Sequence, residues 1–147
     1  MSWAESTVVI KRSKYEDRVA KFLDKAGVPY EYEAFSYQYT EPLRKNSASC
    51  KVCGSTSLTR KGWYTPDFFL GNGCIIETKG RFDAADRRKM KAMKEQYPNE
   101  EIVLLFMRDN KLSKLSKTYY SDWCMDNGYD FDIGMPPPRW LKEIYDE

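Results

Sequence analysis

Three polar residues beside one predicted hairpin could carry out phosphate chemistry. Asp67 precedes the run Phe68–Leu70, and Glu77 and Lys79 follow a second apolar run. The residues between the runs, Gly71–Gly73, are a strong signal for a tight turn between antiparallel strands. If all three form the turn, Asp67 lies directly opposite Glu77, with Cβ atoms about 4.5 to 5.5 Å apart. A two-residue turn would change the register and separate the two carboxylates.

Two carboxylates at this separation can hold one hard cation. Mg²⁺ takes oxygen ligands at about 2.0 to 2.1 Å. Lys79 lies two residues beyond Glu77, so it points to the same face, roughly 6 to 7 Å further along the strand. The cation would activate a water and stabilise charge on a phosphate, and the lysine would position or deprotonate the nucleophile. The pattern therefore favours metal-dependent phosphodiester hydrolysis, although an exposed hairpin with charges on its wet face has the same spacing.

Composition limits the other possibilities. The 147 residues, 41% of them hydrophobic and 15% aromatic, predict a single domain over residues 1–147 that buries a core. The absence of histidine excludes catalytic triads and metal sites that need an imidazole. No run approaches the roughly 18 to 20 apolar residues that span a bilayer, and the first residues lack a signal-peptide pattern. We therefore expect a cytoplasmic protein with no membrane partner.

Basic residues are concentrated in two segments, although the whole chain is nearly neutral, with 24 basic and 22 acidic side chains. One segment precedes the hairpin and the other follows it. Such segments suit phosphate backbones, but a solvated helix face or loop has the same composition. The candidate DNA contacts are Arg44, Lys45, Arg81, Arg87, Arg88 and Lys91.

The first predicted helix begins at Ser13. Glu16 stands three residues later, as in a capping box, apolar residues follow at helical spacing, and Gly27 ends the helix. Glu16 thus has a purely helical explanation as well as a possible role in a metal site. From Val28 to Tyr39 the side chains alternate in polarity, which predicts a strand with a break near its middle.

The remaining elements complete an α/β pattern. They are a basic helix over about Ala84–Gln96, a buried strand over Glu101–Met107, a helix over about Tyr119–Asn127 and a short terminal helix after three prolines. The order predicts a mixed β-sheet flanked by helices.

The segment at about residues 40–62 reads as an insertion or bridge. It has no sustained apolar period, so a metal, a partner chain or DNA would have to order it. Its pair Cys50 and Cys53 resembles one zinc knuckle, but tetrahedral zinc needs four ligands. Two protomers could share one Zn²⁺, or the pair could be free or redox-active. Cys74 and Cys124 are predicted to be small core residues.

Six short stretches together resemble the T7-type phage endonuclease I family. The members of this family are Holliday-junction resolvases with a restriction-endonuclease-like fold. The match runs in order over nearly the whole chain. The stretches are Ser13–Asp17, Tyr64–Phe68, Gly73 with Glu77–Gly80, Asp86–Lys89, Glu95–Pro98 and Pro138–Trp140.

The resemblance implies a role for each site residue. Asp67, Glu77 and Glu16, with the backbone carbonyl of Thr78, would bind two Mg²⁺ or Mn²⁺ ions, and Lys79 would be the catalytic lysine. It also implies structure-selective cleavage of four-way junctions and other branched DNA by an intertwined, segment-swapped homodimer, in the cytoplasm of a bacterial host if a phage encodes the chain. In such a dimer Glu16 of one protomer would work with the hairpin of the other. The bridge at 40–62 is longer than the family's.

Two other functions remain open at this point. A non-catalytic zinc-knuckle module could bind nucleic acid through the basic helix, with Asp67 and Glu77 as ordinary surface charges. A restriction or repair endonuclease of the same fold could read a DNA sequence instead of a branch.

Overall fold

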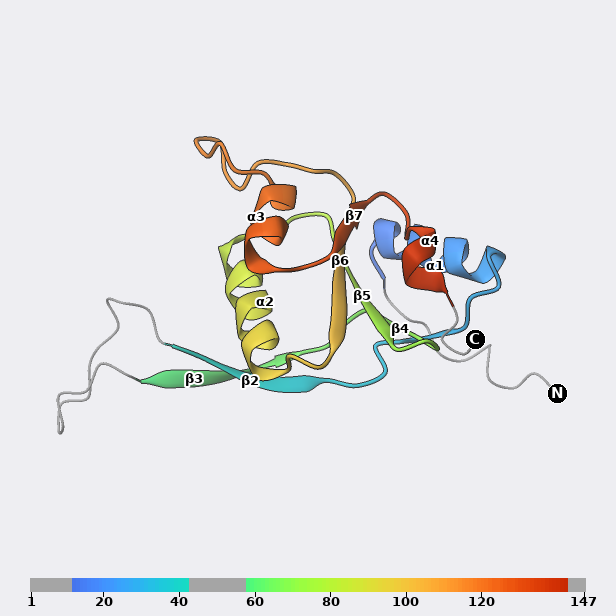
Figure 1. Ribbon diagram of the computed structural model, residues 1–147, viewed down its shortest axis with the longest axis horizontal. Helices are drawn as coiled ribbons and strands as arrows, with labels where there is room; N and C mark the ends of the chain where they lie inside the picture. Colours follow the sequence, from blue (N-terminus) through green and yellow to red (C-terminus); the bar gives the residue numbers. More distant parts are fainter. Residues whose placement is uncertain (1–11, 43–57, 143–147) are drawn as a thin grey trace.

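A mixed five-stranded sheet lies between two layers of helices, and a two-stranded ribbon extends from it (Figure 1). The computed structural model describes residues 12–42 and 58–142. This architecture confirms the predicted α/β class. The elements are α1 (Lys14–Lys25), β1 (Tyr30–Tyr32), β2 (Tyr37–Pro42), β3 (Thr59–Tyr64), β4 (Phe68–Leu70), β5 (Cys74–Lys79), α2 (Ala84–Gln96), β6 (Glu101–Phe106), α3 (Tyr120–Asn127), β7 (Phe131–Ile133) and α4 (Pro138–Leu141).

The main sheet has the strand order β1-β4-β5-β6-β7. The strands β1, β4 and β5 are antiparallel, whereas β5, β6 and β7 are parallel. The β4–β5 hairpin pairs Phe68 with Ile76, which is the register of a three-residue turn. Gly73 closes that turn at φ 93°, a conformation that favours glycine, and its N–H donates to the Leu70 carbonyl at 3.1 Å. The predicted hairpin is therefore confirmed in its register.

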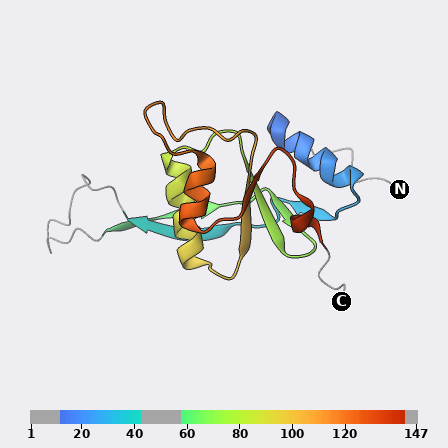
Figure 2. The ribbon, with the colours of Figure 1, turned by 45° about the horizontal axis from the view of Figure 1, so that its top comes forward.

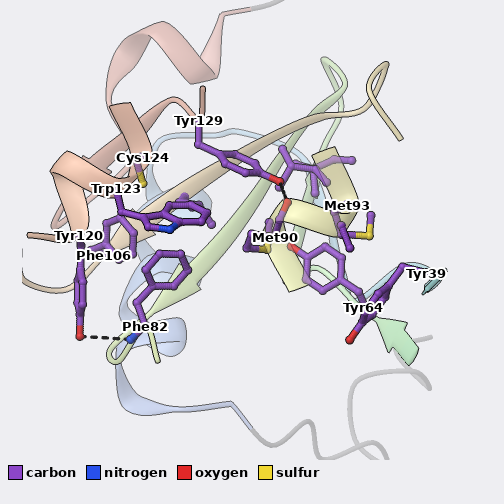
Figure 3. Packing of buried hydrophobic residues seen from close by; sticks show 14 of the residues in the cluster. Tyr39, Tyr64, Phe82, Met90, Met93, Phe106, Tyr120, Trp123, Cys124 and Tyr129 are labelled. Atoms are coloured by element: carbon purple, nitrogen blue, oxygen red, sulfur yellow. Dashed lines mark hydrogen bonds between the residues drawn. The ribbon is translucent and has the colours of Figure 1, made fainter. Parts of the chain in front are cut away.

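Each face of the sheet packs against one pair of helices (Figures 1 and 2). α1 and α4 cover one face through residues such as Leu23 and Trp140. α2 and α3 cover the other, where an aromatic cluster fills the space between them (Figure 3). In that cluster the Phe82 ring lies 5.0 Å from Trp123, and the Phe82 backbone N–H donates to the Tyr120 hydroxyl. These contacts fix the start of α2 beside the end of β5.

The ribbon corrects two sequence-based expectations. The predicted strand from Val28 to Tyr39 does break, between Tyr32 and Tyr37, but its two parts, β1 and β2, belong to different sheets. Both ends of the segment at 40–62 are also regular, because β2 pairs antiparallel with β3 from Tyr37↔Tyr64 to Pro42↔Thr59. The Tyr39 ring packs so closely on Gly62 that a Cβ there would lie 2.7 Å from it. Cys50, Cys53, Arg44 and Lys45 lie outside the described residues.

Two further expectations have simple outcomes. The buried positions of Cys74 and Cys124 confirm them as core residues. Within residues 12–42 and 58–142, no helix has the length and apolar character needed to cross a membrane.

Candidate active site

Asp67 and Glu77 meet across the β4–β5 hairpin, as the turn predicts. Continuing the register by one pair places them opposite each other, and their residues are only 7% and 6% exposed. Asp67 Oδ2 accepts two hydrogen bonds from Thr78, one from the backbone N–H at 2.9 Å and one from the hydroxyl at 2.7 Å. Thr78 thus fixes the orientation of Asp67. The role of the Thr78 backbone carbonyl as a metal ligand stays a prediction.

The Glu77 carboxylate lies between a tyrosine and a lysine. Tyr64 donates its hydroxyl to Oε1 at 3.1 Å, and Lys79 Nζ lies 3.2 Å from Oε2. Lys79 Nζ also contacts Asp86 Oδ1 at 3.0 Å. Asp86 belongs to the capping box that begins α2, where its other oxygen accepts the Asp83 N–H. Lys79 is therefore held from two sides, on the same face as Glu77.

Glu16 enters the same cluster from the start of α1. The predicted capping box is present, since Ser13 Oγ accepts the Glu16 N–H and Glu16 Oε1 accepts the Ser13 N–H. Glu16 Oε2 accepts the Tyr32 hydroxyl at 3.1 Å. Glu16, Glu33 and Asp67 each place one carboxylate oxygen within 4.8 Å of the others. Glu16 is thus both a helix cap and a member of the acidic cluster, and these contacts lie within one chain.

Glu33 is the site residue that the sequence reasoning missed. Polarity alternation placed it with Glu31 on one face of a strand. Glu33 is exposed, but its φ of 52° is left-handed and interrupts the alternation. Such a backbone costs a residue other than glycine about 1 to 2 kcal/mol. Its N–H donates to the Asp67 carbonyl at 2.8 Å, which continues the β1–β4 pairing. Only the pairing of β1 with β4, which is not visible in the local sequence, would have placed Glu33 here.

The cluster is electrostatically strained. Burial, the charge of Glu77 and the neighbouring carboxyl of Glu16 raise the pKa of Asp67 to about 9, against the hydrogen bonds from Thr78. Burial also raises the pKa of Glu77, although Lys79 and Tyr64 oppose it. Burial acts in the same direction on Glu16, but hydrogen bonds from Asp67, Ser13 and Tyr32 lower its pKa overall. The carboxylates of the cluster thus outnumber the positive charges beside them. Such a set of oxygen donors fits a hard divalent cation.

Lys79 is held in its charged form. Burial by itself would lower its pKa, but the negative charges of Glu77 and Asp86 outweigh burial and raise the pKa. The ammonium group can therefore orient an anionic oxygen, and it is poorly suited to accept a proton while both carboxylates are charged.

Comparison with known proteins decides the family. A family model for phage endonuclease I matches residues 2–147. The chain belongs to the phage endonuclease I family. It is 35% identical over 133 residues to endonuclease I of Escherichia phage T7, covering 90% of this chain and 78% of that protein. It is 36% identical over 133 residues to endodeoxyribonuclease 1 of Enterobacteria phage T3, covering 90% and 77%. The resemblance noted in the sequence is confirmed, and the chain is a nuclease.

The predicted phosphate contacts of this member of the family differ in their surroundings. Arg81 and Lys91 are exposed, and neither forms an ion pair with another described residue. Arg87 donates to the Phe82 carbonyl at 2.6 Å, and Arg88 Nε lies 3.6 Å from Glu41 on β2. The latter two arginines therefore also have structural contacts. Their roles on DNA stay predictions.

Lys89, which was not among the predicted contacts, lies beside Tyr64, the tyrosine that donates to Glu77. Its Nζ is 5.6 Å from the Tyr64 ring centroid, and its positive charge opposes the rise that burial causes in the pKa of Glu77.

Proposed function

We propose that the protein is a metal-dependent DNA endonuclease that hydrolyses phosphodiester bonds at four-way junctions and other branched structures. The observation that carries this proposal is the buried pair Asp67 and Glu77 beside Lys79, with Glu16 completing the acidic cluster. DNA is supported as the substrate by the name of the T3 relative, an endodeoxyribonuclease. The preference for branches rests on the family resemblance.

Each residue has a distinct role in this proposal. Glu16, Asp67, Glu77 and the Thr78 carbonyl hold Mg²⁺ or Mn²⁺, with two ions per active site, and Glu33 adds a further carboxylate. When bound, such an ion acts as a Lewis acid on the phosphate and lowers the pKa of a water. The Lys79 ammonium orients a phosphate oxygen and stabilises the charge that develops on it. Thr78 and Tyr64 keep the two central carboxylates in position through their hydrogen bonds.

The proposed assembly is an intertwined homodimer of restriction-endonuclease-like subunits. In a segment-swapped dimer an element packs on the partner as it would on its own chain. Glu16 of one protomer would then lie beside Asp67 of the partner, just as Glu16 lies beside Asp67 within the single chain. Cys50 and Cys53 of both protomers would share one Zn²⁺.

Cleavage of a synthetic four-way junction tests the proposed function. We expect nicks near the branch with Mg²⁺, none with EDTA, and none with the Asp67→Asn variant. A linear duplex of the same sequence and a junction of unrelated sequence are the controls. Cleavage of the linear duplex at one sequence would favour a sequence-reading endonuclease. Junction binding without cleavage in any metal would favour a non-catalytic binding module.

Mixed dimers test the exchange of Glu16. One protomer carries only Glu16→Ala and the other only Asp67→Ala, and two affinity tags select the mixed species. If sites are composite, one site collects both lesions and the other is intact, so one labelled strand is nicked. If each chain houses a complete site, both sites are damaged and no strand is cut. Absence of nicking in a mixed dimer that still binds the junction would rule out the exchange.

A further inference from the structure

The loop between β6 and α3, residues 107–119, carries charge that the proposed site does not use. Arg108, Lys111, Lys114 and Lys117 are all exposed, and none forms an ion pair with another described residue. The loop has one acidic residue, Asp109, whose carboxylate accepts the backbone N–H and the hydroxyl of Ser121. The cations are therefore uncompensated within the loop.

The loop is an ordered projection. The Leu112 N–H donates to the Thr118 carbonyl at 2.8 Å, and the Thr118 N–H donates to Ser116 Oγ at 2.9 Å. Leu112 packs against the core cluster between α2 and α3. Leu115, in contrast, stands at the tip and is 96% exposed. An apolar side chain is thus held in solvent between two lysines of a hydrogen-bonded loop.

The projection starts at the same end of the sheet as the candidate active site. The Met107 N–H donates to the Lys79 carbonyl at 3.0 Å, so the base of the loop adjoins the catalytic lysine. Leu115 lies eight residues further, which places the tip at most about 29 Å away along an extended chain. This reach is less than one turn of B-DNA, roughly 34 Å. In Figures 1 and 2 the loop stands out from this end of β6 and α3.

We infer that the 107–119 loop is a DNA-contacting element, in which Lys111, Lys114 and Lys117 bind the backbone phosphates of one DNA arm and Leu115 contacts the bases at the branch. Uncompensated lysines release counterions when they meet phosphates. Apolar tips such as leucine insert where base stacking is interrupted, and a branch point provides such a place. The inference rests on the proposed function, because it takes branched DNA as the ligand.

Binding of labelled DNA without divalent metal tests the loop, because the DNA then stays uncut. The Lys114→Gln/Lys117→Gln variant should weaken binding to junction and linear duplex alike. It should reduce the slope of log K against log salt by about 0.9 for each phosphate that a lysine no longer neutralises. The matched control is Lys25→Gln/Lys142→Gln. Both of its lysines are exposed. Lys25 lies in the last turn of α1, and the carbonyl of Lys142 accepts a hydrogen bond from Asn72 in the β4–β5 turn, at the opposite end of β5 from Lys79, so the control should leave the slope unchanged.

The tip is tested separately by Leu115→Ser. Burial of a leucine side chain at the branch is worth about 1.5 kcal/mol or more, so the variant should lose about tenfold in junction affinity and little in duplex affinity. Unchanged slope and affinity in the lysine variant, or an equal effect in its control, would overturn the phosphate contacts. Equal junction preference in Leu115→Ser and wild type would overturn the branch contact.

The outcomes separate this inference from the proposed function. If wild type binds the junction but no metal supports cleavage, the proposed catalysis fails while the loop is still judged by binding. If wild type cuts junctions and the loop variants behave as wild type, only the loop inference fails. If wild type binds neither DNA, both fail.

Discussion

Replacing Asp67 by asparagine should stabilise the metal-free protein while abolishing cleavage. The folded state raises the pKa of Asp67 from 3.8 to about 9. Between these values the folded protein holds a proton that the unfolded chain releases, so stability falls as pH rises. Asparagine has no charge to bury, and its carbonyl oxygen can still accept both hydrogen bonds from Thr78.

The size of the effect follows from the pKa shift. One pKa unit corresponds to about 1.4 kcal/mol, so the upper limit at pH 8 is about 5 to 6 kcal/mol. We expect about 2 kcal/mol, since relaxation and water reduce the cost of the buried charge, and this corresponds to roughly 6 °C in Tm for a chain of this size. The lowered pKa of Glu16 and the raised pKa of Lys79 contribute stability that is present throughout pH 5 to 9, so they do not alter the trend.

Thermal unfolding followed by circular dichroism measures this difference. In EDTA, wild type should lose stability from pH 5 to pH 9, whereas Asp67→Asn should show a flatter profile and the higher Tm at pH 8. Saturating Mg²⁺ should raise the Tm of wild type more than that of the variant, because a ligand of the folded state stabilises it. A wild-type Tm that rises with pH over this range, or an asparagine variant that is less stable at pH 8, would refute the electrostatic reasoning.

Other site residues give further predictions. Glu77→Gln and Lys79→Ala should each reduce cleavage at least about 100-fold and leave junction binding intact, because binding rests on phosphate contacts elsewhere; weakened binding would count against these roles. Glu16→Gln should keep a near-normal Tm, since glutamine also serves in a capping box, yet cut poorly; normal cleavage would leave Glu16 as a helix cap only. Elemental analysis should find one zinc per dimer, which Cys50→Ser removes; a wild-type value of zero would exclude the shared site.

Local signals predicted the parts of the fold that depend on neighbours in sequence. The β4–β5 register follows from Gly71–Gly73, and the start of α1 follows from Ser13 and Glu16. α2 has the predicted bounds, since its capping box and its apolar positions lie within one short stretch. For the same reason Asp67, Glu77 and Lys79 could be placed together before the structure was known.

Features that depend on distant partners could not be predicted. β3 forms because it pairs with β2, although the segment at 40–62, which holds most of β3, shows no sustained apolar period. β7 has three residues and forms along the edge that β6 exposes, so Phe131–Ile133 was not expected as a strand. The approach of Glu16 to Asp67 requires the packing of α1 on the sheet, and the position of Glu33 requires its left-handed backbone.

Two helices begin with capping boxes whose third-position carboxylates also face the site. One oxygen of Glu16 accepts the N–H of the N-cap residue Ser13, and the other accepts the Tyr32 hydroxyl. In the same way, one oxygen of Asp86 accepts the N–H of the N-cap residue Asp83, and the other contacts Lys79. A helix start needs only a hydrogen-bond acceptor, whereas metal binding and lysine contact need negative charge. Exchange of both carboxylates for amides would therefore remove charge while keeping both helix starts. Such a folded, charge-depleted protein would be suited to capturing an intact substrate for structural study.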